Sequence, residues 1–348
     1  MEYKVMSSPS SVYEHMLSDI RGAKREILLE SYFYGNDKIG RIFLDELTKK
    51  AAQGVRVRLL LDAWGSDVKK KFFKKLIKAG GEVRFFRELR YAFHWFAANH
   101  ERNHRKLLII DGEITYIGSM NITNSCINWR ELVLRLDGSL TNSFRLAFNH
   151  SWKRFNLFGV HKMKKIFYKG FEIVQDFPRA KRGRTERSYA KLIKRADREI
   201  FIETPYFVPS IRIRHEFKMA LKRGVEIKII LPKNSDIKLM DIFRNRYLGK
   251  LSKMGVKIYY YPKTLHSKLL IVDENFFLLG SSNLDYRSFK HQYEINLLGR
   301  DRVVIDLLGR HFRGTLKKSR VFNYSIWKNR HRYAKILEKF IGPFREYF

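Results

Sequence analysis

The apolar positions of the chain follow a pattern that occurs twice in the same order. Each half shows an apolar strand, an amphipathic helix that ends at a glycine (Gly54 or Gly224), a second strand, a basic helix and a third strand. The strands expected on this basis are 27–33, 55–61 and 81–86 in the first half and 200–207, 225–231 and 255–260 in the second. Strands separated by helices predict α/β units with largely parallel sheets, and the repeat predicts two homologous domains.

A basic and aromatic stretch, residues 151–187, lies between the two halves and ends in a run that contains proline, glycine, lysine and arginine. Such a run is typical of a connection between domains. We therefore expect an N-terminal domain over residues 1–176 and a C-terminal domain over residues 177–348. The chain has 348 residues, 45% of them hydrophobic, which is enough for two separate cores.

Each half continues with the same polar residues at the same spacing around a predicted β-hairpin. They are His104, Lys106, Asp111, Ser119 and Asn121 in the first half and His266, Lys268, Asp273, Ser281 and Asn283 in the second. A two-residue turn at 112–113 would place Lys106 opposite Ser119 and would put the polar residues on one side of the sheet. A turn at 274–275 predicts the same register for the second hairpin. Asp111 and Asp273 fall at the turns, where we expect them to stabilise the turn rather than take part in catalysis.

These polar residues suit phosphodiester transfer if the two domains bring them together. One histidine would attack phosphorus to form a phosphohistidine, while the other would protonate the leaving oxygen and then deprotonate the acceptor alcohol. Lys106, Lys268, Asn121 and Asn283 would stabilise charge on the non-bridging oxygens. The lysines would repel a cation and no carboxylate or thiol cluster has ligand spacing, so the sequence predicts neither a metal nor another cofactor.

A histidine in this role needs a carboxylate on its other ring nitrogen. Glu131 and Glu294 are candidates because each follows the histidine of its own half at nearly the same distance, 27 residues in one case and 28 in the other. Taken singly, each could equally be an ordinary surface glutamate.

The duplicated residues resemble the paired HxKxxxxD motifs of the phospholipase D superfamily, and the resemblance extends from about Ile20 to Arg313. The segments around them, 26–32, 103–107, 129–131 and 282–289, are similar to those of bacterial cardiolipin synthases. The resemblance implies a two-domain pseudo-dimer of phospholipase D-like α/β domains with the active site in the cleft between them. It implies phosphatidyl transfer from phosphatidylglycerol to a second phosphatidylglycerol without a metal, with His104 as the nucleophile and His266 as the acid and base.

Charge and composition indicate an anionic partner. There are 70 Lys and Arg against 35 Asp and Glu, a net charge of +35, and 14% of the residues are aromatic. Mixed basic and aromatic residues suit an anionic phospholipid membrane somewhat better than a nucleic-acid groove. No apolar run approaches the length of a spanning helix, no signal peptide is evident and there is one cysteine. We therefore expect a cytoplasmic protein bound peripherally to the inner face of the cell membrane.

Three segments are candidates for membrane contact. Phe93, Trp95 and Phe96 precede the first motif and form the strongest of them; residues 152–171 form the second. In the third, the tail 316–348, apolar residues such as Ile336 and Phe340 recur at helical spacing among Lys and Arg. This pattern fits an interfacial helix, and it fits equally a helix packed on the second domain.

Other functions share parts of this pattern. A hydrolytic phospholipase D or a phosphatidylserine synthase would use the same chemistry with another acceptor. A nuclease of the same superfamily would suit the charge, although the lipid-type segments around the motifs argue against nucleic acid as the partner. An inactive lipid- or nucleic-acid-binding protein would not need intact motifs in both halves.

Overall fold

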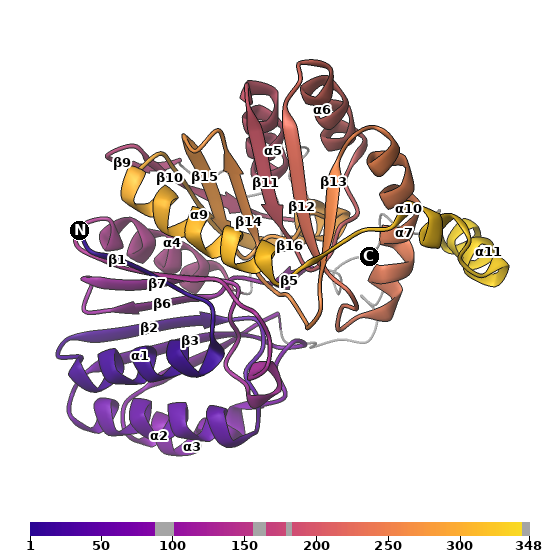
Figure 1. Cartoon of the computed structure of the whole chain (residues 1–348). Helices are drawn as coiled ribbons and strands as arrows, with labels where there is room; N and C mark the ends of the chain where they lie inside the picture. The colour runs from indigo at the N-terminus through magenta and orange to yellow at the C-terminus, as the bar shows by residue number, and fades with distance from the viewer. Residues whose placement is uncertain (88–100, 156–164, 179–182, 343–348) are drawn as a thin grey trace.

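The computed structural model describes residues 1–87, 101–155, 165–178 and 183–342, which form two β-sheets covered by helices (Figure 1). The strands are β1 (Tyr3–Met6), β2 (Glu26–Ser31), β3 (Arg56–Asp62), β4 (Glu82–Phe86), β5 (Arg102–Asn103), β6 (Leu107–Ile110), β7 (Ile114–Gly118), β8 (Val133–Asp137), β9 (Ile166–Tyr168), β10 (Phe171–Asp176), β11 (Glu199–Glu203), β12 (Glu226–Pro232), β13 (Lys257–Tyr261), β14 (Leu269–Val272), β15 (Phe276–Gly280), β16 (Gln292–Gly299) and β17 (Arg320–Val321). The helices are α1 (Pro9–Gly22), α2 (Lys38–Ala52), α3 (Lys74–Lys78), α4 (Thr141–Arg154), α5 (Arg184–Arg195), α6 (Ile211–Lys222), α7 (Lys238–Lys253), α8 (Tyr286–Lys290), α9 (Arg302–Lys317), α10 (Tyr324–Lys328) and α11 (Arg332–Ile341), with short 3₁₀ turns η1 (Lys70–Phe73) and η3 (Asn124–Cys126).

The two sheets are built in the same way. The first has the strand order β1-β8-β7-β6-β2-β3-β4, and the second contains the equivalent order β10-β16-β15-β14-β11-β12-β13, extended by β9 and β17 at its edges. The expected duplicated α/β fold is therefore confirmed. The expectation of largely parallel sheets was wrong, because parallel pairing within the described sheets is confined to β2-β3-β4, β11-β12-β13 and the short pair of β5 with β16. The strands that follow them in each half are joined through hairpins and pair antiparallel.

Sheet membership does not follow the expected division at 176/177. Strands β9 and β10 precede that point, yet β10 pairs with β16 and β9 pairs with β10 in the second sheet. β10 occupies the place in the second sheet that β1 occupies in the first. By strand pairing, the second unit therefore includes residues from Ile166 onward, because each repeat begins with an edge strand ahead of its first helix.

Helices lie on both sides of each sheet, in five layers. Helices α1, α2 and α3 cover the outer face of the first sheet, and α5, α6 and α7 cover the outer face of the second (Figure 1). Helices α4 and α9 lie between the sheets, and their apolar residues join those of both inner faces in one buried cluster. Phe148 of α4 and Phe312 of α9 belong to this cluster. A shared core of this kind fixes the two domains relative to each other.

The register of both motif hairpins differs from the prediction by one residue. Leu107 pairs with Ile117, and Leu269 pairs with Leu279, so three residues rather than two connect each pair of strands. Asp111 and Gly112 have φ values of 55° and 67°. This left-handed turn keeps Asp111 in the connection, and the extended ladder would place Lys106 opposite Gly118 instead of Ser119. The polar residues are brought together beyond the ends of the strands, where the ladder no longer dictates their direction.

The tail separates into an anchored and an exposed part. Trp327 of α10 packs on α7: its indole nitrogen donates to the Asn245 carbonyl oxygen at 3.0 Å and its ring lies over Gly249. Ile336 and Phe340 of α11 are exposed. Packing on the second domain is therefore observed for α10, while an interfacial role for α11 stays a prediction. Phe93, Trp95 and Phe96 lie outside the described residues, and across the described part no helix is long and apolar enough to cross a membrane.

Candidate active site

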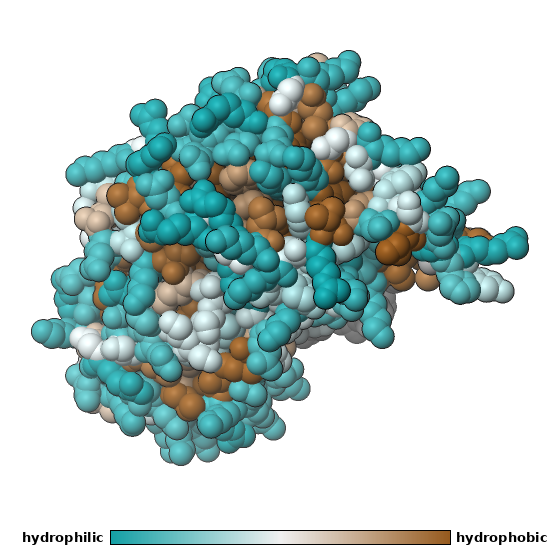
Figure 2. Space-filling model, in the orientation of Figure 1, coloured by the Kyte–Doolittle hydropathy of each residue, from teal (hydrophilic) through white to brown (hydrophobic). Residues whose placement is uncertain are grey.

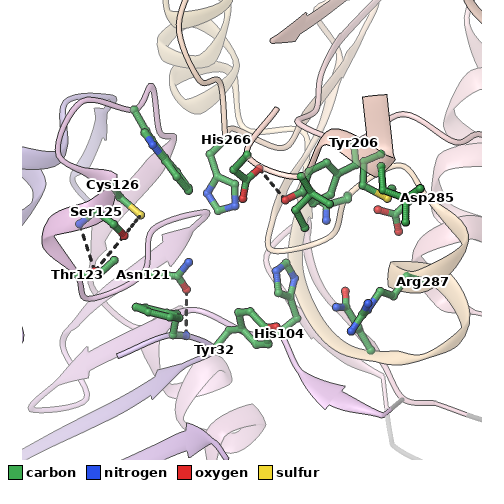
Figure 3. A pocket seen from close by; sticks show the side chains of 18 residues that line it. Tyr32, His104, Asn121, Thr123, Ser125, Cys126, Tyr206, His266, Asp285 and Arg287 are labelled. Carbon is green, nitrogen blue, oxygen red and sulfur yellow. Dashed lines mark hydrogen bonds between the residues drawn. The ribbon is translucent and has the colours of Figure 1, made fainter. Parts of the chain in front are cut away.

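A cavity of about 410 Å³ lies between the two domains, and side chains from both motif hairpins line it. His104, Asn121, His266 and Asn283 are among these residues. In Figure 3 the imidazole rings of His104 and His266 approach the same space from opposite sides. The structure thus brings together the histidines and amides that lie far apart in the sequence, and the cleft between homologous halves is where the repeat predicts a joint site.

Each histidine pairs with the glutamate of the opposite domain. His104 Nδ1 lies 3.0 Å from Glu294 Oε1, and His266 Nδ1 lies 3.0 Å from Glu131 Oε1. Both glutamates are fully buried, so neither is an ordinary surface residue. A carboxylate on Nδ1 fixes the ring and its tautomer and leaves Nε2 for a substrate. The sequence interpretation counted each glutamate from the histidine of its own half, whereas the structure exchanges them across the cleft.

Two serines of the motifs hold these glutamates. The Ser119 hydroxyl donates to Glu131 and accepts from the Leu132 backbone amide at 2.9 Å; Ser281 does the same with Glu294 and the Ile295 amide, at 3.0 Å. The preceding glycine, Gly118 in the first domain, lies so close to the neighbouring strand that a Cβ would overlap the backbone of Leu132. The glycine therefore lets the segment that carries the glutamate approach closely, and the serine fixes the glutamate carboxylate.

The two motif lysines are buried beside the histidines in equivalent positions, and neither is among the residues that line the cavity. Lys106 Nζ donates to the His104 carbonyl oxygen and Lys268 Nζ to the His266 carbonyl oxygen, both at 2.6 Å. Burial and the charge of Lys268 lower the pKa of Lys106 to about 7, and burial lowers the pKa of Lys268 to about 8. Burial makes the charged form of these lysines unfavourable, and a bound anion would compensate for that cost. The lysines therefore favour the binding of an anion. Within the described ranges, no group of three or more His, Cys, Asp or Glu is arranged to hold a metal ion.

The two histidine–glutamate pairs differ in their electrostatics. Burial, together with the charges of Lys106 and Lys268, holds the pKa of His104 well below its ordinary value. Burial also lowers the pKa of His266, but the Glu131 carboxylate opposes this effect. Although burial alone would raise the pKa of Glu131, the charges of His266 and Lys268 lower it, whereas burial raises the pKa of Glu294 to about 7. His104 is therefore the more easily neutral imidazole, and His266 has the better support for a positive charge.

The turn aspartates serve the frame of the site. The Asp111 carboxylate accepts hydrogen bonds from the backbone amides of residues 24–26, and the Asp273 carboxylate accepts them from the amides of residues 197–199. Each aspartate thereby ties the hairpin connection to the start of the neighbouring strand, β2 or β11. Neither belongs to the cavity lining.

The middle residue of each motif faces away from the cavity into a buried polar cluster. Ser267 donates to Glu203 at the end of β11, and His311 of α9 also lies 3.0 Å from the same carboxylate oxygen. In the first domain Arg105 is buried near Glu30; burial raises the pKa of this carboxyl, and the charge of Arg105 opposes that rise. These contacts fix each motif strand from behind.

Several residues that line the cavity were not predicted to have a role. The Tyr32 ring meets the His104 ring edge-on with centroids 5.0 Å apart, and the Trp129 ring meets the His266 ring in the same way at 5.2 Å. Arg287 brings a further cation to the lining, and Tyr206 donates to Asp236 at 2.7 Å. Tyr32 and Tyr206 follow equivalent strands of the two repeats, a signal by which an alignment of the halves could have found them.

Comparisons with known proteins agree with this arrangement. The family model "Cardiolipin synthase, PLD-like domain" matches residues 16–152 and 189–316. A cardiolipin synthase of Clostridium perfringens (strain SM101 / Type A) is 34% identical over 308 residues, which cover 83% of this chain and 64% of that protein. The major cardiolipin synthase ClsA of Bacillus subtilis (strain 168) is 31% identical over 353 residues, which cover 96% of this chain and 73% of that protein.

Among solved structures, the phosphatidylserine synthase of Haemophilus influenzae Rd KW20 has a TM-score of 0.76 at 15% identity, over 99% of this chain and 95% of that one. At this identity the likeness concerns the fold. The chain thus spans slightly less than two thirds of the Clostridium relative and a larger share of the Bacillus one. On the family match to both halves and these relatives, the chain belongs to the cardiolipin synthase family of phospholipase D-like proteins.

Proposed function

We propose that the protein transfers a phosphatidyl group from one phosphatidylglycerol to the glycerol hydroxyl of another, which forms cardiolipin and releases glycerol. The observation that carries the proposal is the facing pair of histidines, each held by a buried glutamate of the opposite domain. The names of the relatives supply the lipid class. Two imidazoles at one cavity, each next to a buried lysine, suit a phosphodiester, which is anionic and needs both a nucleophile and a proton donor.

In the first step His104 Nε2 attacks the phosphorus of phosphatidylglycerol. The bond from phosphorus to the glycerol oxygen breaks, and protonated His266 gives its proton to that oxygen, so that glycerol leaves. The low pKa of His104 keeps its attacking nitrogen unprotonated, and Glu131 stabilises the charged form of His266. Lys106, Lys268 and the amides of Asn121 and Asn283 stabilise the charge on the non-bridging oxygens in the transition state.

The second step reverses the first with another acceptor. Neutral His266 removes the proton from the glycerol hydroxyl of a second phosphatidylglycerol, whose oxygen attacks phosphorus and displaces His104. Cardiolipin forms, His104 becomes neutral again and His266 regains its proton. The same two residues thus serve both steps in exchanged roles, as microscopic reversibility requires.

The proposed substrate is a lipid of an anionic phospholipid membrane, so the protein must reach a membrane surface. We propose that it binds peripherally to the inner face of the cell membrane. The net charge of +35 supports an anionic surface as the partner. Its single cysteine, Cys126, is buried beside the cavity, and burial raises the pKa of its thiol to about 12, so the site does not depend on a disulfide or a reactive thiolate.

The decisive experiment incubates the purified protein with phosphatidylglycerol in mixed micelles and in liposomes, with EDTA present, and follows the lipids by mass spectrometry. His104→Ala and His266→Ala are the matched variants. We expect cardiolipin and glycerol in equal amounts from the wild type and none from either variant. Phosphatidic acid as the only product would replace the proposal with a hydrolase, and unchanged lipid would refute phosphatidyl transfer altogether.

A further inference from the structure

Helix α11 has a continuous apolar face that no part of the described chain covers. Tyr333, Ile336, Leu337 and Phe340 are between 46% and 77% exposed. They follow the i, i+3, i+4, i+7 spacing, which places them on an arc of about 100° of one helix. Helices of globular proteins normally turn such an arc toward a core. Here it faces outward, so the sequence of α11 is suited to a partner.

The side of α11 that carries Glu338 and Ile341 is attached to the protein. Glu338 is buried and pairs with Arg330 at 2.8 Å, and Ile341 packs with the core of the second domain. Gly342 lies against Arg246 of α7. Because α11 is held by these residues, its exposed side chains are presented in a fixed direction. Figure 1 shows α11 projecting from the second domain, and Figure 2 shows brown, apolar surface among teal side chains in the region of α10 and α11.

The border of the apolar face is basic. Arg332, Lys335 and Lys339 are exposed on the adjoining arc of the same helix. A helix with an outward apolar arc and a cationic edge fits the boundary between headgroups and acyl chains of an anionic bilayer. A second copy of this chain is a poorer partner, because it carries the same basic residues and a net charge of +35.

Helix α7 connects this face to the active site. Its first turn contributes Leu239 and Met240 to the cavity lining, next to the exposed Ile237, and its last turns support α10 through Gly249. The helical segment from 239 to 249 spans roughly 15 Å. The end of α11 meets the same helix at Arg246, so one helix contacts both the proposed docking segment and the cavity that must receive lipids.

We propose that α11 is a membrane-docking helix, which inserts Tyr333, Ile336, Leu337 and Phe340 into the surface of an anionic phospholipid bilayer. This inference rests on the proposed function for the source of the lipid, but it concerns a surface outside the catalytic residues. Docking would bring the protein to the substrate without taking part in the chemistry.

The test replaces the four apolar residues with Gln, which keeps helix propensity while removing apolar surface. The control carries Gln at four exposed apolar residues outside the candidate membrane segments, namely Leu146, Ile211, Met254 and Val303. Both proteins are sedimented with vesicles of phosphatidylglycerol and phosphatidylcholine and with vesicles of phosphatidylcholine alone. Circular dichroism and thermal unfolding check that both remain folded, as their exposed positions lead us to expect.

We expect the α11 variant to bind anionic vesicles roughly a hundredfold more weakly than the wild type, and the control variant to bind as the wild type does. Turnover of short-chain phosphatidylglycerol in detergent micelles should be unchanged in both. Equal vesicle binding by the α11 variant and the control would overturn the docking role. So would a self-associated wild type that becomes monomeric in the α11 variant while vesicle binding persists, because α11 would then be a protein interface.

This design separates the two proposals. If the wild type binds vesicles through α11 but turns over no lipid in vesicles or micelles, docking stands and the proposed function fails. If lipid is turned over in micelles and the α11 variant binds vesicles normally, the proposed function stands and docking fails.

Discussion

The exchange of glutamates between domains gives the sharpest prediction. In Glu131→Gln the side chain keeps its shape and still accepts from Ser119, but the carboxylate that supports the charged form of His266 is lost. A hydrogen bond to a charged group contributes about 1.5–3 kcal/mol. If this energy is lost in the transition state, the rate falls roughly 10- to 150-fold. Because Glu131 and His266 are both buried, solvent does not screen the interaction and the upper part of that range applies.

The assay uses two substrates that differ in their leaving group. Phosphatidylglycerol needs a proton from His266 when glycerol leaves, whereas a p-nitrophenyl phosphodiester releases a stable anion without one. The Glu131→Gln variant should therefore still show the rapid burst of p-nitrophenol. The later step, in which the acceptor removes the phosphoryl group from His104, should be slow. Glu294→Gln should lose the burst with either substrate, because Glu294 orients the attacking His104.

A double variant tests whether Glu131 acts through His266. Glu131→Gln added to His266→Ala should not slow the release of the phosphohistidine any further, since the partner of Glu131 is already absent. Thermal unfolding of each variant excludes a merely structural loss. A burst that disappears in Glu131→Gln and persists in Glu294→Gln would refute the roles assigned to the two histidine–glutamate pairs.

Three further predictions concern the frame and the charge of the site. Gly118→Ala should lower the free energy of unfolding by about 2 kcal/mol in a urea titration, since its Cβ would overlap the backbone of Leu132. Asp273→Ala should cost about 2 kcal/mol in the same measurement, because three backbone amides lose their acceptor. Sulfate, whose charge is constant near neutral pH, should bind more weakly as pH rises through about 7 and then about 8, where Lys106 and Lys268 lose their protons. Calorimetry should show a loss of up to about tenfold per pH unit, less steep in Lys106→Met, and a rise in affinity with pH would contradict the assignment of these cations.

The sequence by itself predicted everything that depends on local pattern and repetition. The pattern of apolar positions, with Gly54 and Gly224 after two of the helices, predicted strands and helices in the right order. It could do so because each element buries one face and because glycine readily adopts the positive φ at which these helices end. The repeat predicted two like domains, and the matched spacing of His104 and His266 predicted that the motif residues act together. These features can be predicted from the sequence because both halves fold in the same way and therefore carry the same residue types at the same spacing.

The tertiary structure decided what depends on contacts between distant segments. The hairpin register depends on Asp111, whose carboxylate is held by amides far along the chain, so turn propensity alone gave the wrong partner for Lys106. The partner of each histidine comes from the other domain because Glu131 and Glu294 project across a cleft that only docking of the halves creates. The direction of α11 is likewise tertiary: helical spacing identifies its apolar arc, but only the packing of Ile341 and Gly342 on the second domain leaves that arc exposed.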